Sequence, residues 1–154
     1  MAELGLADLV VLVVEPSVMQ RHIVEKSLAA NGVSDVIPCE TGEQALRLLD
    51  HEAPDLVIST MYLSDMTGTD LVHRIRDSDR TGDTPFLLIS SETRFRYLDA
   101  IRQAGAVGIL PKPFSDAELR TALTATLDLL STDEEFDGDG LRVLVVDDSA
   151  MARR

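Results

Sequence analysis

The sequence has a single cysteine, no tryptophan and only 4% aromatic residues among its 154 residues. One cysteine cannot close a disulfide within the chain, and no paired cysteine or histidine spacing indicates a zinc site. Basic residues are also scarce, because 14 lysines and arginines stand against 27 acidic residues and give a formal charge of −13. Such a charge repels nucleic acid and anionic lipid surfaces, so we expect neither nucleic acid nor a membrane as a partner.

Long hydrophobic runs are missing as well. The longest apolar run near the start covers residues 9–14, far short of the roughly 20 residues that a membrane-spanning helix needs. Residues 1–8 contain Glu3 and Asp8, where a secretory signal carries basic residues. Together with the lone cysteine, these features lead us to expect a cytoplasmic protein that is neither exported nor inserted into a membrane.

The sequence does contain an alternation of two hydrophobic patterns. Segments with helical spacing of apolar residues alternate with short continuous apolar runs, which suit strands buried on both faces. These runs occupy residues 9–14, 56–58, 86–89 and 107–110, with a weaker one at 33–38. Strands and helices that alternate with short connections predict a parallel sheet covered by helices on both faces.

The composition changes near the end of the sequence. Residues 132–140 are rich in acidic residues and contain two glycines, which predicts a linker. Residues 143–153 then repeat the pattern of residues 11–21, VLVVDDSAMAR against VLVVEPSVMQR. This repeat predicts that residues 141–154 begin a second copy of the domain formed by residues 8–131. We expect the sequence to be a piece of a longer protein with two such domains in tandem.

In sheets of this kind, ligands bind beyond the carboxyl ends of the strands, so the residues after each apolar run are the candidates for chemistry. Four segments around these positions are distinctive. They are VLVVEPSVMQR at 11–21, PDLVIST at 54–60 followed by Met66-Thr67-Gly68, the pair Ser90-Ser91, and AGAVGILPKPF at 104–114. With these segments, the sequence resembles the receiver domains of bacterial two-component response regulators over about residues 8–131.

The resemblance implies a flavodoxin-like, doubly wound α/β fold whose five parallel strands have the order 2-1-3-4-5. It also implies phosphoryl transfer to an aspartate at the end of the third strand. Magnesium is held in such sites by that aspartate and by acids after the first strand, while a hydroxyl group and a lysine hold the phosphoryl oxygens. An aromatic residue on the fifth strand swings inward on phosphorylation and acts as the switch.

This sequence departs from that pattern at the acidic positions. The phosphoacceptor position falls on Thr60, the metal-binding pair on Glu15 and Pro16, the hydroxyl on Ser90 and the lysine on Lys112. A hydroxyl group without an adjacent base is a poor nucleophile and cannot form the acyl phosphate that the family uses. Pro16 offers no carboxylate, so we expect no metal and no other cofactor in this domain. We therefore expect a degenerate receiver that is not an enzyme.

The switch is also incomplete in this sequence. Ile109 occupies the position of the switch aromatic, so we expect a domain locked in one conformation, with constitutive binding as its output. Lys112 has no acidic partner at Thr60, and we expect it to pair with Glu15 or to hydrogen-bond Thr60. We expect the Ser90 hydroxyl to hydrogen-bond the backbone at the end of its strand.

The function that we predict is a phosphorylation-independent receiver in a two-component phosphorelay, which contacts other signalling proteins or the adjacent receiver. Asp147 and Asp148 would be metal ligands of that second, phosphorylated receiver. One alternative is a receiver that still accepts phosphate on a displaced residue, Asp65. Another is a structural module that forms a homodimer when residues 142–147 pair with the sheet edge of a neighbour. Four arginines near the last two helices fit either a docking face or a solvated, ion-paired face: Arg94, Arg96, Arg102 and Arg120.

Overall fold

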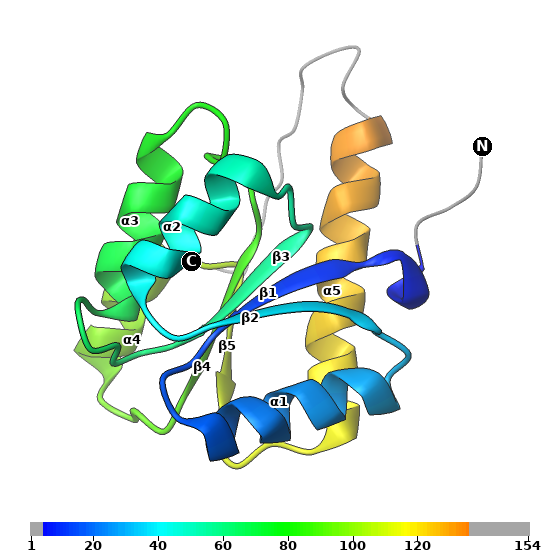
Figure 1. The fold of residues 1–154 in the computed structure, drawn as a ribbon, viewed down its shortest axis with the longest axis horizontal. Coiled ribbons are helices and arrows are strands. Elements are labelled where there is room, and N and C mark those ends of the chain that lie inside the picture. The colour runs from blue at the N-terminus through cyan, green and yellow to red at the C-terminus, as the bar shows by residue number, and fades with distance from the viewer. Residues whose placement is uncertain (1–4, 136–154) are drawn as a thin grey trace.

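The computed structural model describes residues 5–135, in which strands and helices alternate along the chain (Figure 1). The strands are β1 (Val10–Val14), β2 (Asp35–Cys39), β3 (Leu56–Thr60), β4 (Phe86–Ser90) and β5 (Gly108–Pro111). The helices are the short 3-10 helix η1 (Leu6–Asp8), α1 (Val18–Ala30), α2 (Gly42–His51), α3 (Gly68–Asp77), α4 (Phe95–Gln103) and α5 (Asp116–Glu135). Each strand overlaps one of the apolar runs that predict it.

The five strands form one sheet in the order β2-β1-β3-β4-β5. Every pair of neighbouring strands is parallel. The predicted fold class, a flavodoxin-like doubly wound α/β sheet, is therefore confirmed. Because the order reverses between β1 and β3, the loops after these two strands run to opposite sides of the sheet and leave room for a site between them.

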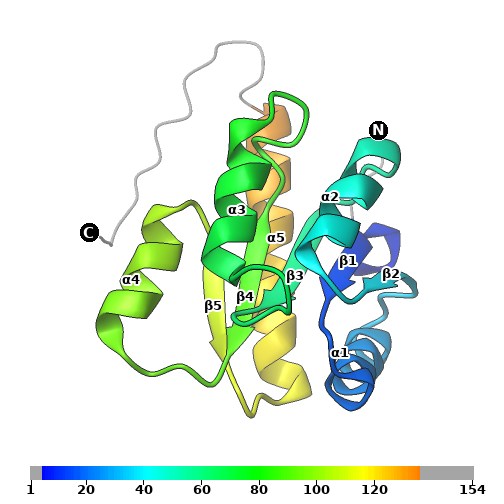
Figure 2. The same ribbon diagram turned by 60° about the vertical axis from the view of Figure 1, so that its left-hand side comes forward.

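Helices cover both faces of the sheet (Figures 1 and 2). Successive residues of a strand point to opposite faces. Leu12 and Val14 accordingly belong to a buried cluster with α2, α3 and α4, while Val11 and Val13 belong to a second cluster with α1 and α5. Two apolar layers thus hold the strands in place and fix where their carboxyl ends lie.

The ends of the helices follow local signals in the sequence. Four helices begin at a hydroxyl group that accepts a hydrogen bond from a backbone N–H in the first turn; the residues are Ser17, Thr41, Thr67 and Ser115. Gly32 and Gly105 follow the ends of α1 and α4 with φ angles of 90° and 114°, which side chains larger than hydrogen rarely allow. The capping box predicted between Ser115 and Glu118 is present in both directions.

Helix α5 extends to Glu135 and enters the segment 132–140, for which we expected a linker. Residues 132–135 contain neither glycine nor proline, and glutamate favours helix, so the helix can continue. Residues 136–140 and the repeat at 141–154, including the segment expected to pair with a sheet edge, lie outside the described residues. Within residues 5–135, none of the helices has both the length and the hydropathy needed to cross a bilayer.

Candidate functional site

The residues assigned to the site from sequence gather at the carboxyl edge of the sheet. Glu15 follows β1 directly, Thr60 and Ser90 are the last residues of β3 and β4, and Lys112 follows β5. The register places Thr60 opposite Ile89 and Ser59 opposite Val14. Because the strands are parallel, all four residues lie on the same edge, where ligands of such sheets bind.

An ion pair between Glu15 and Lys112 crosses this edge. The Lys112 Nζ lies 3.6 Å from the Glu15 Oε1, and the two side chains are 24% and 9% exposed. The other carboxylate oxygen of Glu15, Oε2, accepts a hydrogen bond of 3.0 Å from the backbone N–H of Ser17. The structure thus contains the first of the two arrangements predicted for Lys112, and both oxygens of the carboxylate are engaged.

The Ser90 side chain, at the hydroxyl position, also takes part in a hydrogen bond within the protein. Ser90 is buried, and its hydroxyl oxygen accepts a hydrogen bond of 2.9 Å from the backbone N–H of Glu92. This agrees with the backbone role predicted for Ser90. Ile109, at the switch position, is partly buried and packs against the apolar cluster under α2, α3 and α4. The peptide bond between Lys112 and Pro113 is cis.

These residues do not fit a magnesium ion. Magnesium needs one or two carboxylates that keep free oxygens, together with waters or phosphate. The carboxylate of Glu15 is bound to Lys112 and to the Ser17 amide, Pro16 has no side-chain oxygen, and Thr60 is neutral. Within residues 5–135, no three carboxylate, imidazole or thiol side chains come together as possible ligands of a metal ion.

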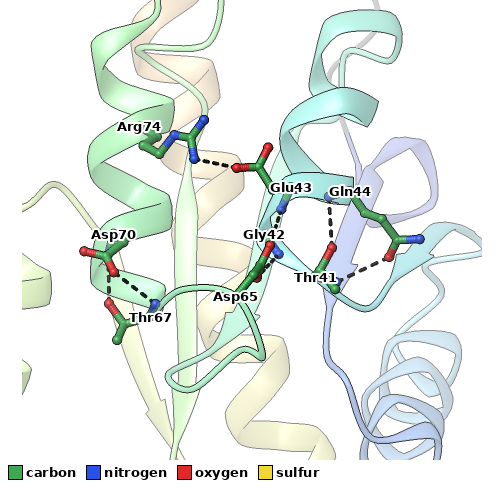
Figure 3. A network of polar contacts seen from close by, with 8 residues as sticks. All are labelled: Thr41, Gly42, Glu43, Gln44, Asp65, Thr67, Asp70 and Arg74. Carbon is green, nitrogen blue, oxygen red and sulfur yellow. Dashed lines mark hydrogen bonds and ion pairs between the residues drawn. The ribbon is translucent and has the colours of Figure 1, made fainter.

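The carboxylate of Asp65 lies at the start of α2 rather than in the site (Figure 3). It accepts hydrogen bonds from the backbone N–H groups of Gly42, at 3.0 Å, and Glu43, at 2.9 Å. These bonds, led by that from Glu43, lower the pKa of Asp65 below its ordinary value. Negative charge at a helix N-terminus is favourable, so Asp65 acts as a cap for α2 beside the local cap Thr41.

Further polar contacts tie the loop after β3 to its neighbours (Figure 3). Thr67 and Asp70 form a capping box at the start of α3. Arg74 of α3 donates a hydrogen bond of 2.8 Å to Glu43 of α2. The loop that leaves the acceptor position is therefore anchored on both α2 and α3.

The only thiol of the chain takes no part in this site. Cys39 is buried at the end of β2. Burial raises the pKa of the Cys39 thiol to about 12. The thiol therefore stays protonated at neutral pH and is a poor nucleophile.

Comparison with known proteins agrees with this architecture. Residues 11–124 match the response regulator receiver domain family. This chain belongs to that family. The receiver domain is 31% identical over 117 residues to the chemotaxis protein CheY1 of Helicobacter pylori, an alignment that covers 75% of this chain and 94% of CheY1.

Solved structures give the same result for the receiver domain. The chemotaxis response regulator CheY4 of Vibrio cholerae superimposes with a TM-score of 0.69 at 29% identity, over 75% of this chain and 96% of that one. The receiver domain of the sensor histidine kinase PA1611 from Pseudomonas aeruginosa was solved with a magnesium ion in its active site cleft. It has a TM-score of 0.71 at 23% identity, over 78% of this chain and 98% of that one, a likeness that shows the fold alone.

Proposed function

We propose that this receiver domain works without phosphorylation and acts through protein–protein contacts in a two-component signalling pathway. The acceptor position carries Thr60, a neutral hydroxyl where the family has a carboxylate nucleophile. Pro16 removes one of the carboxylates that would hold magnesium. The domain therefore supplies neither the nucleophile nor the metal site that the transfer of a phosphoryl group to a carboxylate requires.

The ion pair between Glu15 and Lys112 is the observation that carries this proposal. A lysine at this edge could hold a phosphoryl group only with its charge directed toward the phosphoryl oxygens. Here the Lys112 ammonium faces the carboxylate of Glu15 at 3.6 Å. An incoming phosphoryl group would have to break a partly buried ion pair and would then lie beside the negative charge of Glu15. Both effects oppose phosphorylation.

The contacts of Asp65 weigh against this residue as a displaced acceptor. Its two oxygens accept hydrogen bonds from the Gly42 and Glu43 amides of α2. Such bonds stabilise the carboxylate and make it a weaker nucleophile. Conversion of either oxygen to an acyl phosphate would also remove part of the cap of α2.

We infer that the receiver domain has no enzymatic role of its own and uses no cofactor. Its partners would be other cytoplasmic signalling proteins or an adjacent receiver whose metal ligands include Asp147 and Asp148. In that arrangement the adjacent receiver would carry the phosphoryl group, and this domain would modulate it by contact. The structural alternative is a module that forms a homodimer. The mass of the chain in solution distinguishes this homodimer from a monomer that contacts an adjacent receiver.

The test is intact mass spectrometry of the full chain after incubation with Mg²⁺ and a small-molecule acyl phosphate. We expect no mass increase corresponding to one phosphoryl group. A double variant, Thr60→Asp with Pro16→Asp, is the positive control, because it restores the acceptor and the second metal carboxylate and should gain a hydroxylamine-labile adduct. An adduct on the parent chain, whether acid-stable on Thr60 or hydroxylamine-labile on Asp65, would contradict the proposal.

A further inference from the structure

Helix α4 begins differently from the other long helices of the sheet. The helices α1, α2, α3 and α5 begin at a serine or threonine whose hydroxyl caps the first turn. The residue at this position of α4 is Arg94, which makes no side-chain capping bond. Its side chain turns back to Glu92 instead. The start of α4 is therefore fixed by other contacts.

Glu92 is the centre of those contacts. Arg94 donates three hydrogen bonds to the carboxylate, from its backbone N–H at 2.8 Å, from Nε at 2.8 Å and from Nη2 at 2.9 Å. The Tyr62 hydroxyl donates a fourth bond of 3.2 Å. Only 6% of the Glu92 side chain is exposed, against 61% for Arg94. The bonds from Arg94 lower the pKa of Glu92 to about 2, so the carboxylate is charged at neutral pH.

The contacts continue onto the first turn of α4. The Arg94 guanidinium lies 4.3 Å from the centroid of the Tyr97 ring, and that of Arg96 lies 5.5 Å from the same centroid. Both distances are within the range at which a cation is attracted to an aromatic face. Tyr62, Glu92, Arg94 and Tyr97 form one continuous set of contacts, which we call the α4 latch.

The position of the α4 latch relates it to the site. Tyr62 is two residues beyond Thr60, the acceptor position on β3, and Glu92 is two residues beyond Ser90, the hydroxyl position on β4. One route by which a phosphoryl group held between these two positions could act on α4 is through the loops that carry Tyr62 and Glu92. In this structure the hydrogen bond from the Tyr62 hydroxyl to the Glu92 carboxylate joins the two loops directly.

We propose that the α4 latch holds the first turn of α4 in one arrangement independently of phosphorylation. The surface that it fixes includes Phe95, which is 74% exposed, between the two arginines that flank the Tyr97 ring. This inference rests on the proposed function. A latch formed by the protein's own side chains can fix α4 in place of a phosphoryl group only if the domain works without phosphorylation. Glu92 is the positioning residue of this device, and Tyr62 links it to the loop after β3.

The experiment compares hydrogen–deuterium exchange in the full chain and in three variants. Glu92→Gln removes the charge at the centre of the latch, and Tyr62→Phe removes only the hydroxyl. Glu43→Gln is the matched control, because it weakens the Arg74–Glu43 ion pair, also 2.8 Å long, on α2 and α3. We expect exchange over residues 92–98 to become about two- to fivefold faster in Glu92→Gln, in keeping with the small energy of an ion pair in which one partner, Arg94, is exposed to solvent. The effect of Tyr62→Phe should be smaller.

Tyrosine fluorescence gives a second measurement. The chain has two tyrosines and no tryptophan, and both tyrosines belong to the α4 latch, so the emission reports on the latch alone. We expect the emission to change in Glu92→Gln and to remain that of the parent in Glu43→Gln. Exchange and emission in Glu92→Gln that match the parent, or an equal effect of the control, would overturn the inference.

Adding Mg²⁺ and a small-molecule acyl phosphate to the parent chain separates this inference from the proposed function. We expect exchange over residues 92–98 to stay unchanged. A phosphoryl adduct accompanied by altered exchange would refute the proposed function and the independence of the latch together. No adduct, with Glu92→Gln behaving as the parent, would refute the latch and leave the proposed function standing.

Discussion

Breaking the ion pair between Glu15 and Lys112 should destabilise the receiver domain, and the size of the effect follows from its geometry. The charges lie 3.6 Å apart, and at the effective dielectric constant typical of pairs near a protein surface the attraction is about 5 kcal/mol. Desolvation offsets most of this, because Glu15 is only 9% exposed and Lys112 is 24% exposed. We expect a net coupling free energy of about 1–2 kcal/mol between the two side chains.

The two single variants should differ in their cost. Lys112→Gln leaves a buried carboxylate whose remaining partner is the backbone N–H of Ser17, so we expect a loss of about 2–3 kcal/mol. Glu15→Gln should cost less, about 1–2 kcal/mol, because the more exposed ammonium of Lys112 can extend into water on its flexible stem. The order of the two costs is a prediction in itself.

A double-mutant cycle measures the coupling. Urea unfolding of the parent, both single variants and the double variant at pH 7 gives the four free energies of unfolding. A loss of about 1.5 kcal/mol shifts the urea midpoint by roughly 1 M for a domain of this size. A coupling below about 0.5 kcal/mol, within the error of additivity, would refute the conclusion that Glu15 holds Lys112.

Three further predictions concern stability. Asp65→Ala should cost about 0.5–2 kcal/mol at neutral pH because it removes a cap of α2. The pKa of Asp65 is lowered from its ordinary value of 3.8, so this stabilisation is present above that value and is lost as pH falls through the lower pKa of the folded state. The thermal unfolding temperatures of variant and parent should therefore converge as pH falls below 3.8. Arg76→Met should cost about 2–4 kcal/mol in urea unfolding, because the Arg76 guanidinium donates hydrogen bonds to three backbone carbonyls at 2.6–3.1 Å. A loss under about 1 kcal/mol would argue against a stabilising role of these bonds. Gly68→Ala should cost about 1–3 kcal/mol in the same assay, because the added Cβ would lie 2.9 Å from the Thr60 carbonyl oxygen and 2.9 Å from Leu88 Cδ1. An unchanged urea midpoint would show that the loop after β3 can move to accommodate the methyl group.

Much of the fold can be predicted from sequence because its signals are local. Continuous apolar runs identify β1, β3, β4 and β5, since parallel strands inside a sheet are buried on both faces. The segment that predicts β2 is weaker because it contains Ser34 and Asp35, and this edge strand is only partly buried. Gly32, Gly105 and the Ser115–Glu118 box mark helix ends through contacts within a few residues. The order of the strands came from the family resemblance, because apolar patterning alone does not choose among sheet orders.

The site is only partly predictable for the same reason. The positions of Thr60, Pro16 and Lys112 follow from the resemblance. The need of a buried cation for a partner leaves Glu15 and Thr60 as alternatives for Lys112, and the structure contains the pair with Glu15. Asp65 caps α2 through bonds to Gly42 and Glu43, which precede it by 23 and 22 positions in the sequence. No local pattern indicates such a contact.

One contact of the α4 latch is equally non-local. Tyr62 and Glu92 are separated by 30 positions. From sequence, the arginines of this region fit a docking face and an ion-paired face equally well. In the structure Arg94 is ion-paired with Glu92 and lies against the Tyr97 ring. The bond from Tyr62 to Glu92 depends in addition on how the two loops approach each other. Such an approach is set by tertiary packing, so propensity and spacing do not reveal it.

The measurement that tests the central claim most directly is the intact mass of the full chain after incubation with Mg²⁺ and a small-molecule acyl phosphate. The parent chain should show no phosphoryl adduct, while the Thr60→Asp, Pro16→Asp variant should acquire one that hydroxylamine removes. A phosphoryl adduct on the parent chain that maps within residues 5–135 would contradict the claim that this receiver domain works without phosphorylation.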